Sequence, residues 1–124
     1  MEENQSEKIV VFATHGGEDP ERATLPFVVG NGALAMDIPV TIILQTEGVT
    51  LAKRGHYEHI FAPGFDPLKK LVDSFLELGG KILVCIPCME TRHITEDMLL
   101  EGTEMGKVGR VIQEVLEAKA VLNY

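Results

Sequence analysis

Three continuous runs of apolar and β-branched residues constrain the fold more than any other feature of this chain. They span residues 9–13, 40–44 and 82–85. Because these runs are continuous rather than alternating, they are typical of strands covered on both faces, as in a parallel sheet. Two shorter segments, 103–105 and 120–122, are candidates for further strands.

Helical patterns lie between these runs. Apolar residues recur at helical spacing in 25–36, 68–76 and 108–116, and each pattern predicts an amphipathic helix with one buried stripe. The pairs Asp19-Pro20 and Asp66-Pro67 are helix start signals, with the acidic residue as N-cap. This alternation of strands and helices predicts a single-domain, doubly wound α/β fold with a mainly parallel sheet.

Length and charge limit the classes of function. The chain has 124 residues, the size of one domain, and we expect a polar tail over 1–7 and a single domain over 8–124. The N-terminal segment does not resemble a signal peptide and no apolar run approaches the length of a membrane span, so we expect a cytoplasmic location. The net charge of −8 argues against nucleic acid or an anionic membrane as the main partner.

The chain has two cysteines, Cys85 and Cys88, and they follow the third apolar run with C-x-x-C spacing. Ligands of open α/β sheets bind at the carboxyl ends of the strands, which is where this pair is expected. A disulfide across so short a loop would add little stability, and the cytoplasm keeps thiols reduced. The spacing therefore favours thiols that take part in chemistry.

The residues leave several kinds of thiol site open. A thiol–disulfide redox pair uses the C-x-x-C spacing to lower the pKa of one thiol and to resolve mixed disulfides. A zinc site needs four ligands, which His56 and His59 could complete with Cys85 and Cys88. The third alternative is an inert pair, with the first cysteine buried in its strand.

Two further side chains are candidates for the same site. Arg92 follows the cysteines closely and could stabilise a thiolate or persulfide, although Glu90 could compete for it. His15 lies in the loop after the first strand and is either a proton donor or a hydrogen-bonded loop residue. The two loops meet if their strands are neighbours.

These residues resemble the DsrE/DsrF-like family, which includes sulfur-relay subunits and YchN-like proteins. The resemblance covers 8–124 and rests on the opening loop with His15 and on the pattern Cys-x6-Arg-x-Ile, met by Cys85, Arg92 and Ile94. It implies a three-layer, flavodoxin-like fold and homo- or hetero-oligomers, often trimers or hexamers. It also implies that Cys85 carries sulfane sulfur as a persulfide. Two departures are His93, where relay subunits often have glycine, and the second thiol, Cys88.

The sequence thus predicts a cytoplasmic sulfur-carrier or sulfurtransferase-like protein that needs no cofactor or metal. The candidate catalytic residues are Cys85, Cys88, Arg92 and His15. Expected partners are further copies or related subunits, together with proteins that donate or accept sulfur. The alternatives are a redox protein that uses the two cysteines and a non-enzymatic oligomeric binding module.

Overall fold

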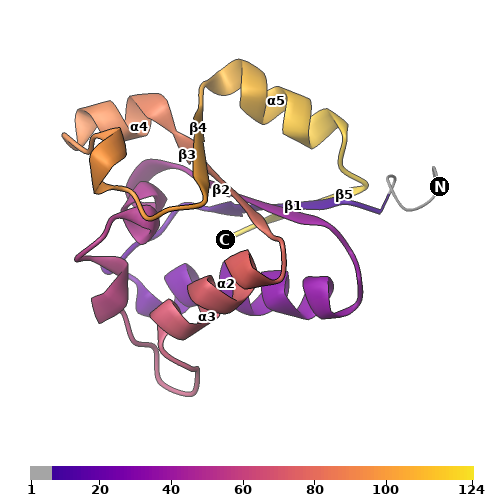
Figure 1. Ribbon diagram of the computed structural model, residues 1–124, viewed down its shortest axis with the longest axis horizontal. Coiled ribbons are helices and arrows are strands. Elements are labelled where there is room, and N and C mark those ends of the chain that lie inside the picture. The colour runs from indigo at the N-terminus through magenta and orange to yellow at the C-terminus, as the bar shows by residue number, and fades with distance from the viewer. Residues whose placement is uncertain (1–6) are drawn as a thin grey trace.

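The computed structural model describes residues 7–124. Its centre is a sheet of five strands in the order β4-β3-β2-β1-β5, in which all neighbouring strands run parallel (Figure 1). The strands are β1 (Ile9–Ala13), β2 (Val40–Leu44), β3 (Lys81–Cys85), β4 (Thr103–Gly106) and β5 (Ala120–Asn123). The predicted strands and the parallel sheet are confirmed. The tail predicted for 1–7 lies, apart from Glu7, outside the described residues.

Helices cover both faces of the sheet, which confirms the doubly wound, three-layer α/β fold. In Figure 1, α2 and α3 lie below the sheet, and α4 and α5 lie above it. Among the helices of residues 7–124, none combines the length and apolarity needed to cross a bilayer. The helical elements are α2 (Pro20–Ala35), α3 (Leu68–Glu77), α4 (Ile86–Thr91) and α5 (Val108–Leu116), with the short 3-10 segments η1 (Thr46–Ala52), η2 (Tyr57–His59) and η3 (Glu96–Met98).

Helix starts follow the sequence signals in one case and depart from them in the other. α2 begins at Pro20, and the Asp19 carboxylate caps it by accepting the Arg22 backbone N–H at 3.2 Å. α3 begins at Leu68 with Pro67 as N-cap and has no side-chain cap. The N-cap predicted at Asp66 is therefore wrong by one residue.

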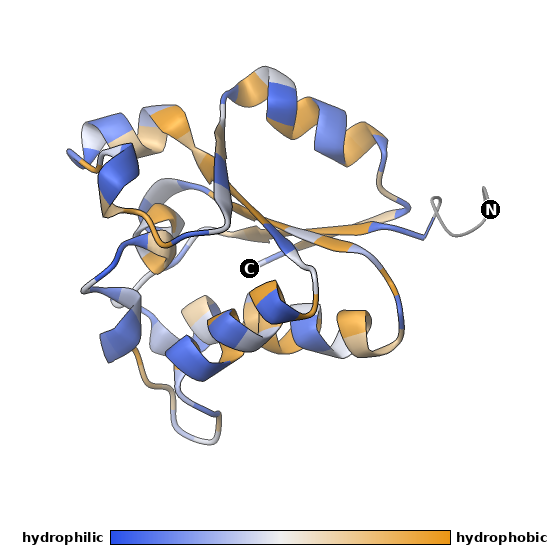
Figure 2. Cartoon of the chain, viewed as in Figure 1, coloured by the Kyte–Doolittle hydropathy of each residue, from blue (hydrophilic) through white to orange (hydrophobic). Residues whose placement is uncertain are grey.

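The side chains of the strands divide between two cores because successive residues point to opposite faces. β2 is buried along its whole length, and Ile42 packs on the face covered by α2 and α3 while Ile43 packs on the other face. Figure 2 shows these hydrophobic strands between the helical layers. Phe27 of α2 and Phe75 of α3 meet edge to face with ring centroids 5.6 Å apart.

Candidate functional site

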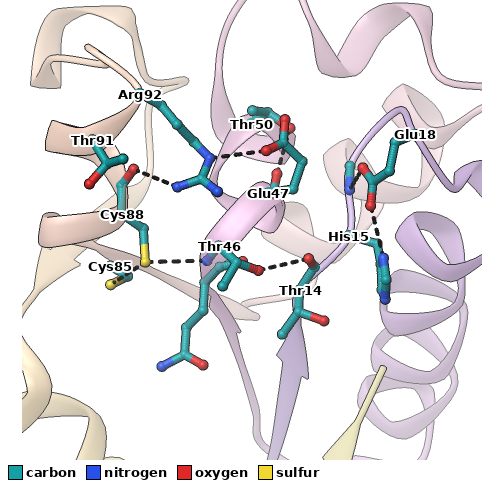
Figure 3. A network of polar contacts seen from close by, with 12 residues as sticks. Thr14, His15, Glu18, Thr46, Glu47, Thr50, Cys85, Cys88, Thr91 and Arg92 are labelled. Carbon is teal, nitrogen blue, oxygen red and sulfur yellow. Dashed lines mark hydrogen bonds and ion pairs between the residues drawn. The ribbon is translucent and has the colours of Figure 1, made fainter.

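The carboxyl ends of β3, β2 and β1 lie side by side, and each is followed by polar or thiol side chains. Cys85 ends β3, Thr46 follows β2, and Thr14 follows β1 (Figure 3). Since ligands of open α/β sheets bind at this edge, we take it as the candidate site.

Two glycines let the loops after β1 and β2 pack backbone against backbone. A Cβ at Gly48 would lie 1.9 Å from the carbonyl oxygen of Ala13, and a Cβ at Gly16 would lie 2.9 Å from that of Glu47. The carbonyl of Ala13 also accepts the backbone N–H of Gln45 at 3.1 Å. This close packing fixes where η1 starts and thereby positions Thr46.

The two thiols are in direct contact. α4 begins at Ile86, immediately after Cys85, so Cys88 lies in the first turn of the helix and returns toward the end of β3. The Sγ atoms of Cys85 and Cys88 are 2.8 Å apart, and both thiols are free and half-buried. The cysteines are therefore placed to exchange a proton or to form a disulfide with little movement.

The environment of Cys85 disfavours its thiolate. Burial raises the pKa of the Cys85 thiol, and the hydrogen bond with Cys88 raises it further. The backbone N–H of Cys88 and the positive charge of Arg92 act in the opposite direction and do not offset the burial. Cys85 consequently needs a nearby proton acceptor before it can act as a nucleophile, and the Cys88 sulfur is at hydrogen-bond distance.

Thr46 is a contact of the thiol pair that was not predicted. Its backbone N–H points to the Sγ of Cys88 at 3.2 Å, and its Oγ1 donates to the carbonyl oxygen of Thr14 at 2.8 Å. Its φ of 49° lies in the left-handed region, which a β-branched residue rarely adopts. The only sequence signal for it was its place two residues after the second apolar run.

Arg92 lies beside the thiols but is held by other groups. Its Nε donates to Oε1 of Glu47 at 3.0 Å, and its Nη1 donates to the carbonyl oxygen of Cys88 at 3.2 Å. The carboxylate that pairs with Arg92 is thus Glu47 in η1. The sequence had suggested Glu90 instead. Residues two apart on a helix point in different directions, which keeps Glu90 away from Arg92.

His15 is not brought together with the thiols. β2 lies between β1 and β3, so the loop with His15 is roughly 10 Å from the end of β3. Its Nδ1 lies 2.8 Å from Oε2 of Glu18, whose other oxygen accepts the backbone N–H of Gly16. Burial acts to raise the pKa of Glu18, but the hydrogen bonds from His15 and Gly16 outweigh it and lower the pKa.

The remaining histidines do not form a metal site with the thiols. Within residues 7–124, no three His, Cys, Asp or Glu side chains are grouped to hold a metal ion, so the zinc site with His56 and His59 is not assembled. The His56 ring lies near Gly17, in the loop after β1. His93 has a φ of 57° and ends α4 in the left-handed conformation that glycine adopts more readily.

The fold and this edge of the sheet define a three-layer α/β protein with a paired-thiol site at the carboxyl ends of its strands. The chain belongs to the DsrE/DsrF-like family, which it matches over residues 7–124. The resemblance seen in the sequence is therefore confirmed.

Individual proteins are also similar to this chain in sequence or in fold. One uncharacterized protein of Methanocaldococcus jannaschii is 34% identical over 80% of this chain, and the chain spans 36% of that relative's length. Another from the same organism is 29% identical over 94% of this chain and 99% of its own length. The crystal structure of the YchN protein of E. coli superposes with a TM-score of 0.80, at 21% identity, over 95% of this chain and 99% of that one. A protein of unknown function from Methanobacterium thermoautotrophicum has a TM-score of 0.77 at 16% identity, over 96% of this chain and 100% of its own.

Proposed function

We propose that the protein accepts sulfane sulfur on Cys85 as a persulfide and acts as a sulfur-carrier or sulfurtransferase-like protein in a reducing compartment such as the cytoplasm. The observation that carries this proposal is the position of the Cys85 thiol. It ends β3 at the edge where open α/β sheets generally bind ligands, with its sulfur 2.8 Å from that of Cys88, in a chain of the DsrE/DsrF-like family.

The neighbouring groups support nucleophilic attack by Cys85 on a sulfane donor. Because the pKa of Cys85 is raised, its thiol has to give up a proton to another group before it attacks. The Cys88 sulfur is in contact with it and is placed to take part in that proton transfer. Arg92 adds positive charge that favours an anion on Cys85, and its bonds to Glu47 and to the Cys88 carbonyl hold the guanidinium near α4. His15, two strands away, remains only a candidate proton donor that would need a substrate spanning the edge.

Mass spectrometry after anaerobic exposure to inorganic polysulfide or thiosulfate tests this proposal. We expect sulfur uptake that is lost in Cys85→Ser, because the thiolate of Cys85 is the atom that bonds to sulfur, and in Cys88→Ser this uptake should appear as a one-sulfur adduct that maps to Cys85. The Cys88→Ser variant serves as the matched control and should still accept sulfur on Cys85. The absence of any adduct in both wild type and Cys88→Ser would contradict the proposal.

A second candidate function is thiol–disulfide exchange, which the 2.8 Å contact of the two sulfurs favours. Here the pair would form a disulfide with glutathione disulfide, without uptake of sulfur. A reduction potential between the cytosolic poise and that of glutaredoxins would support this function. A pair that becomes oxidised only when the protein unfolds would exclude it.

We also propose that the chain associates with itself. Val108, Ile112 and Leu116 form an apolar stripe along α5 at i, i+4 and i+8, with exposed fractions of 71%, 52% and 80%. Such a stripe on a helix is typical of a surface that packs against another chain. Burial of this stripe in a homo-oligomer fits the trimers or hexamers implied by the resemblance, while the acidic surface disfavours nucleic acid and membranes.

Sedimentation of two charge variants of α5 tests the self-association. Ile112→Lys places a charge in the stripe, and we expect it to lower the oligomeric mass, because burying an unpaired charge is costly. Gln113→Lys, an exposed neighbour outside the stripe, should leave the mass unchanged. An Ile112→Lys variant with the same mass as wild type argues against this interface.

A further inference from the structure

The contacts of Cys88 set it apart from an incidental thiol. Its Sγ lies 2.8 Å from the Sγ of Cys85 and accepts the backbone N–H of Thr46 at 3.2 Å. An amide that donates to sulfur stabilises the thiolate form, because hydrogen bonds to charged groups are stronger than those to neutral ones. The Cys88 sulfur therefore lies between the Cys85 thiol and a backbone N–H donor, where it can reach the sulfur of Cys85.

Thr46 donates this N–H from a backbone conformation that its own side chain disfavours. A φ of 49° is rare for a residue with a branched Cβ. The Oγ1 of Thr46 lies at hydrogen-bond distance from the carbonyl oxygens of Gln45 (2.7 Å) and Thr14 (2.8 Å), which holds it there, and the tight packing of Gly48 on Ala13 fixes the next residues. Backbone strain of this kind persists at sites where it orients a functional group, and the group oriented here is the amide on Cys88.

We propose that Cys88 is a resolving thiol, so that sulfane sulfur taken up by Cys85 leaves as sulfide and the protein acts as a sulfane-sulfur reductase. The geometry that points to this is the joint contact of Cys88 with the Cys85 sulfur and with the Thr46 amide. The inference rests on the proposed function, because it concerns the fate of the persulfide on Cys85.

The reaction balances in two steps. First, Cys85 attacks a polysulfide as its thiolate while the remaining proton of the pair is on Cys88, which gives Cys85–S–S⁻, Cys88–SH and a polysulfide shorter by one sulfur. Second, the persulfide takes the proton from Cys88–SH, and the Cys88 sulfur attacks the inner sulfur of Cys85–S–SH. The S–S bond to the outer sulfur breaks, HS⁻ leaves, and the Cys85–Cys88 disulfide forms.

The two cysteines supply both electrons for one turnover. The sulfane sulfur is reduced to sulfide while the cysteine sulfurs are oxidised to the disulfide. An external dithiol then reduces the disulfide and restores the starting state. A protein that only carries sulfur would lack the second step, since its persulfide has to survive until the acceptor arrives.

A single-turnover experiment with inorganic polysulfide tests this inference. Reduced wild type, Cys85→Ser and Cys88→Ser are treated anaerobically without external thiol, desalted and analysed by intact mass and peptide mapping. We expect wild type to lose the mass of two hydrogens as the disulfide forms and to release sulfide. Cys88→Ser should retain the one-sulfur adduct on Cys85 and release none. Thr91→Val, on the same helix but with its Oγ1 donating to the Pro87 carbonyl, is the control and should behave as wild type.

The outcomes separate this inference from the proposed function. A wild-type protein that keeps the one-sulfur adduct on Cys85 without forming a disulfide overturns the inference and leaves the proposed function intact. A lack of sulfur uptake by both wild type and Cys88→Ser overturns both. In a third outcome, wild type forms the Cys85–Cys88 disulfide with glutathione disulfide, but Cys88→Ser takes up no sulfur. This outcome supports the redox function and overturns the inference.

The positioning role of Thr46 is tested through the reactivity of Cys88. In a Cys85→Ser background, we expect Thr46→Val to slow alkylation of Cys88 by iodoacetamide about tenfold, because valine lacks the Oγ1 bond that holds the left-handed backbone. Thr46→Ser should restore the rate, and Thr46→Gly should keep it because glycine adopts a φ of 49° without strain. Equal rates in the valine and glycine variants would overturn the assignment to the amide.

Discussion

Replacing Gly48 with alanine is expected to lower the free energy of unfolding by about 3 kcal/mol. The added Cβ would lie 1.9 Å from the carbonyl oxygen of Ala13, and this obstacle is backbone that cannot rotate away. Relief requires the loops after β1 and β2 to separate, which also moves Thr46 away from the Cys88 sulfur. Urea unfolding measures the loss of stability, and slower iodoacetamide alkylation of Cys88 measures the displacement of the amide.

Gly32→Ala provides the matched control for this substitution. Gly32 lies in the interior of α2, and a Cβ there meets no atom within 4 Å. Alanine should therefore stabilise the protein by about 0.5–1 kcal/mol, since it removes the conformational freedom of glycine without a clash. If both alanine variants had similar stability, the close packing of the two loops would not explain why position 48 requires glycine.

The pattern of the sequence predicted the strands because burial on both faces leaves a local signature. The continuous runs that became β1, β2 and β3 are buried between two helical layers, as such runs require. The spatial order of the strands has no such signature, because a continuous apolar run can pair with any parallel neighbour. This is why the position of β2 between the loop of His15 and the end of β3 could not be predicted.

The parts of the site that escaped prediction depend on contacts between distant residues. η1 carries no helical or strand periodicity, and its start is set by the packing of Gly48 on Ala13. The partner of Arg92 is Glu47, which is 45 residues away in the sequence. The place of Cys85 at the end of a strand was predictable, whereas the amide on Cys88 depends on a left-handed residue that no propensity favours.

The second large effect concerns Glu114, a buried carboxylate that attaches α5 to the sheet. Its Oε1 lies 2.5 Å from Nζ of Lys8, and its Oε2 accepts the Nε of Arg110 at 3.1 Å. Only 7% of the Glu114 side chain is exposed, so its charge depends on these partners. Lys8 also contacts Glu117 at 3.2 Å, but that side chain is 59% exposed.

The ion pair of Lys8 and Glu114 stabilises the fold only within a defined pH range. Burial acts to raise the pKa of Glu114, but the hydrogen bond and charge of Lys8, together with hydrogen bonds from Arg110 and Thr41, outweigh it and lower the pKa. A lowered pKa in the folded state means that the stabilisation is present above the ordinary value of about 4.3 and is lost as the pH falls through the folded value. Lys8 has a raised pKa, because its bonds to Glu114 and Glu117 outweigh burial, so its stabilisation is lost only as the pH rises above about 10.4.

We therefore expect Glu114→Gln to lose about 2 kcal/mol of stability near neutral pH, where the charged hydrogen bonds are intact in wild type. The loss should shrink as the pH falls below about 4, because wild type then loses the same carboxylate by protonation. Urea unfolding at neutral and acidic pH measures both values. Glu117→Gln, which removes the exposed partner of the same lysine, should cost less than about 1 kcal/mol at either pH. A loss in Glu114→Gln that is equal at both pH values would mean that packing, and not the ionised carboxylate, holds α5 on the sheet.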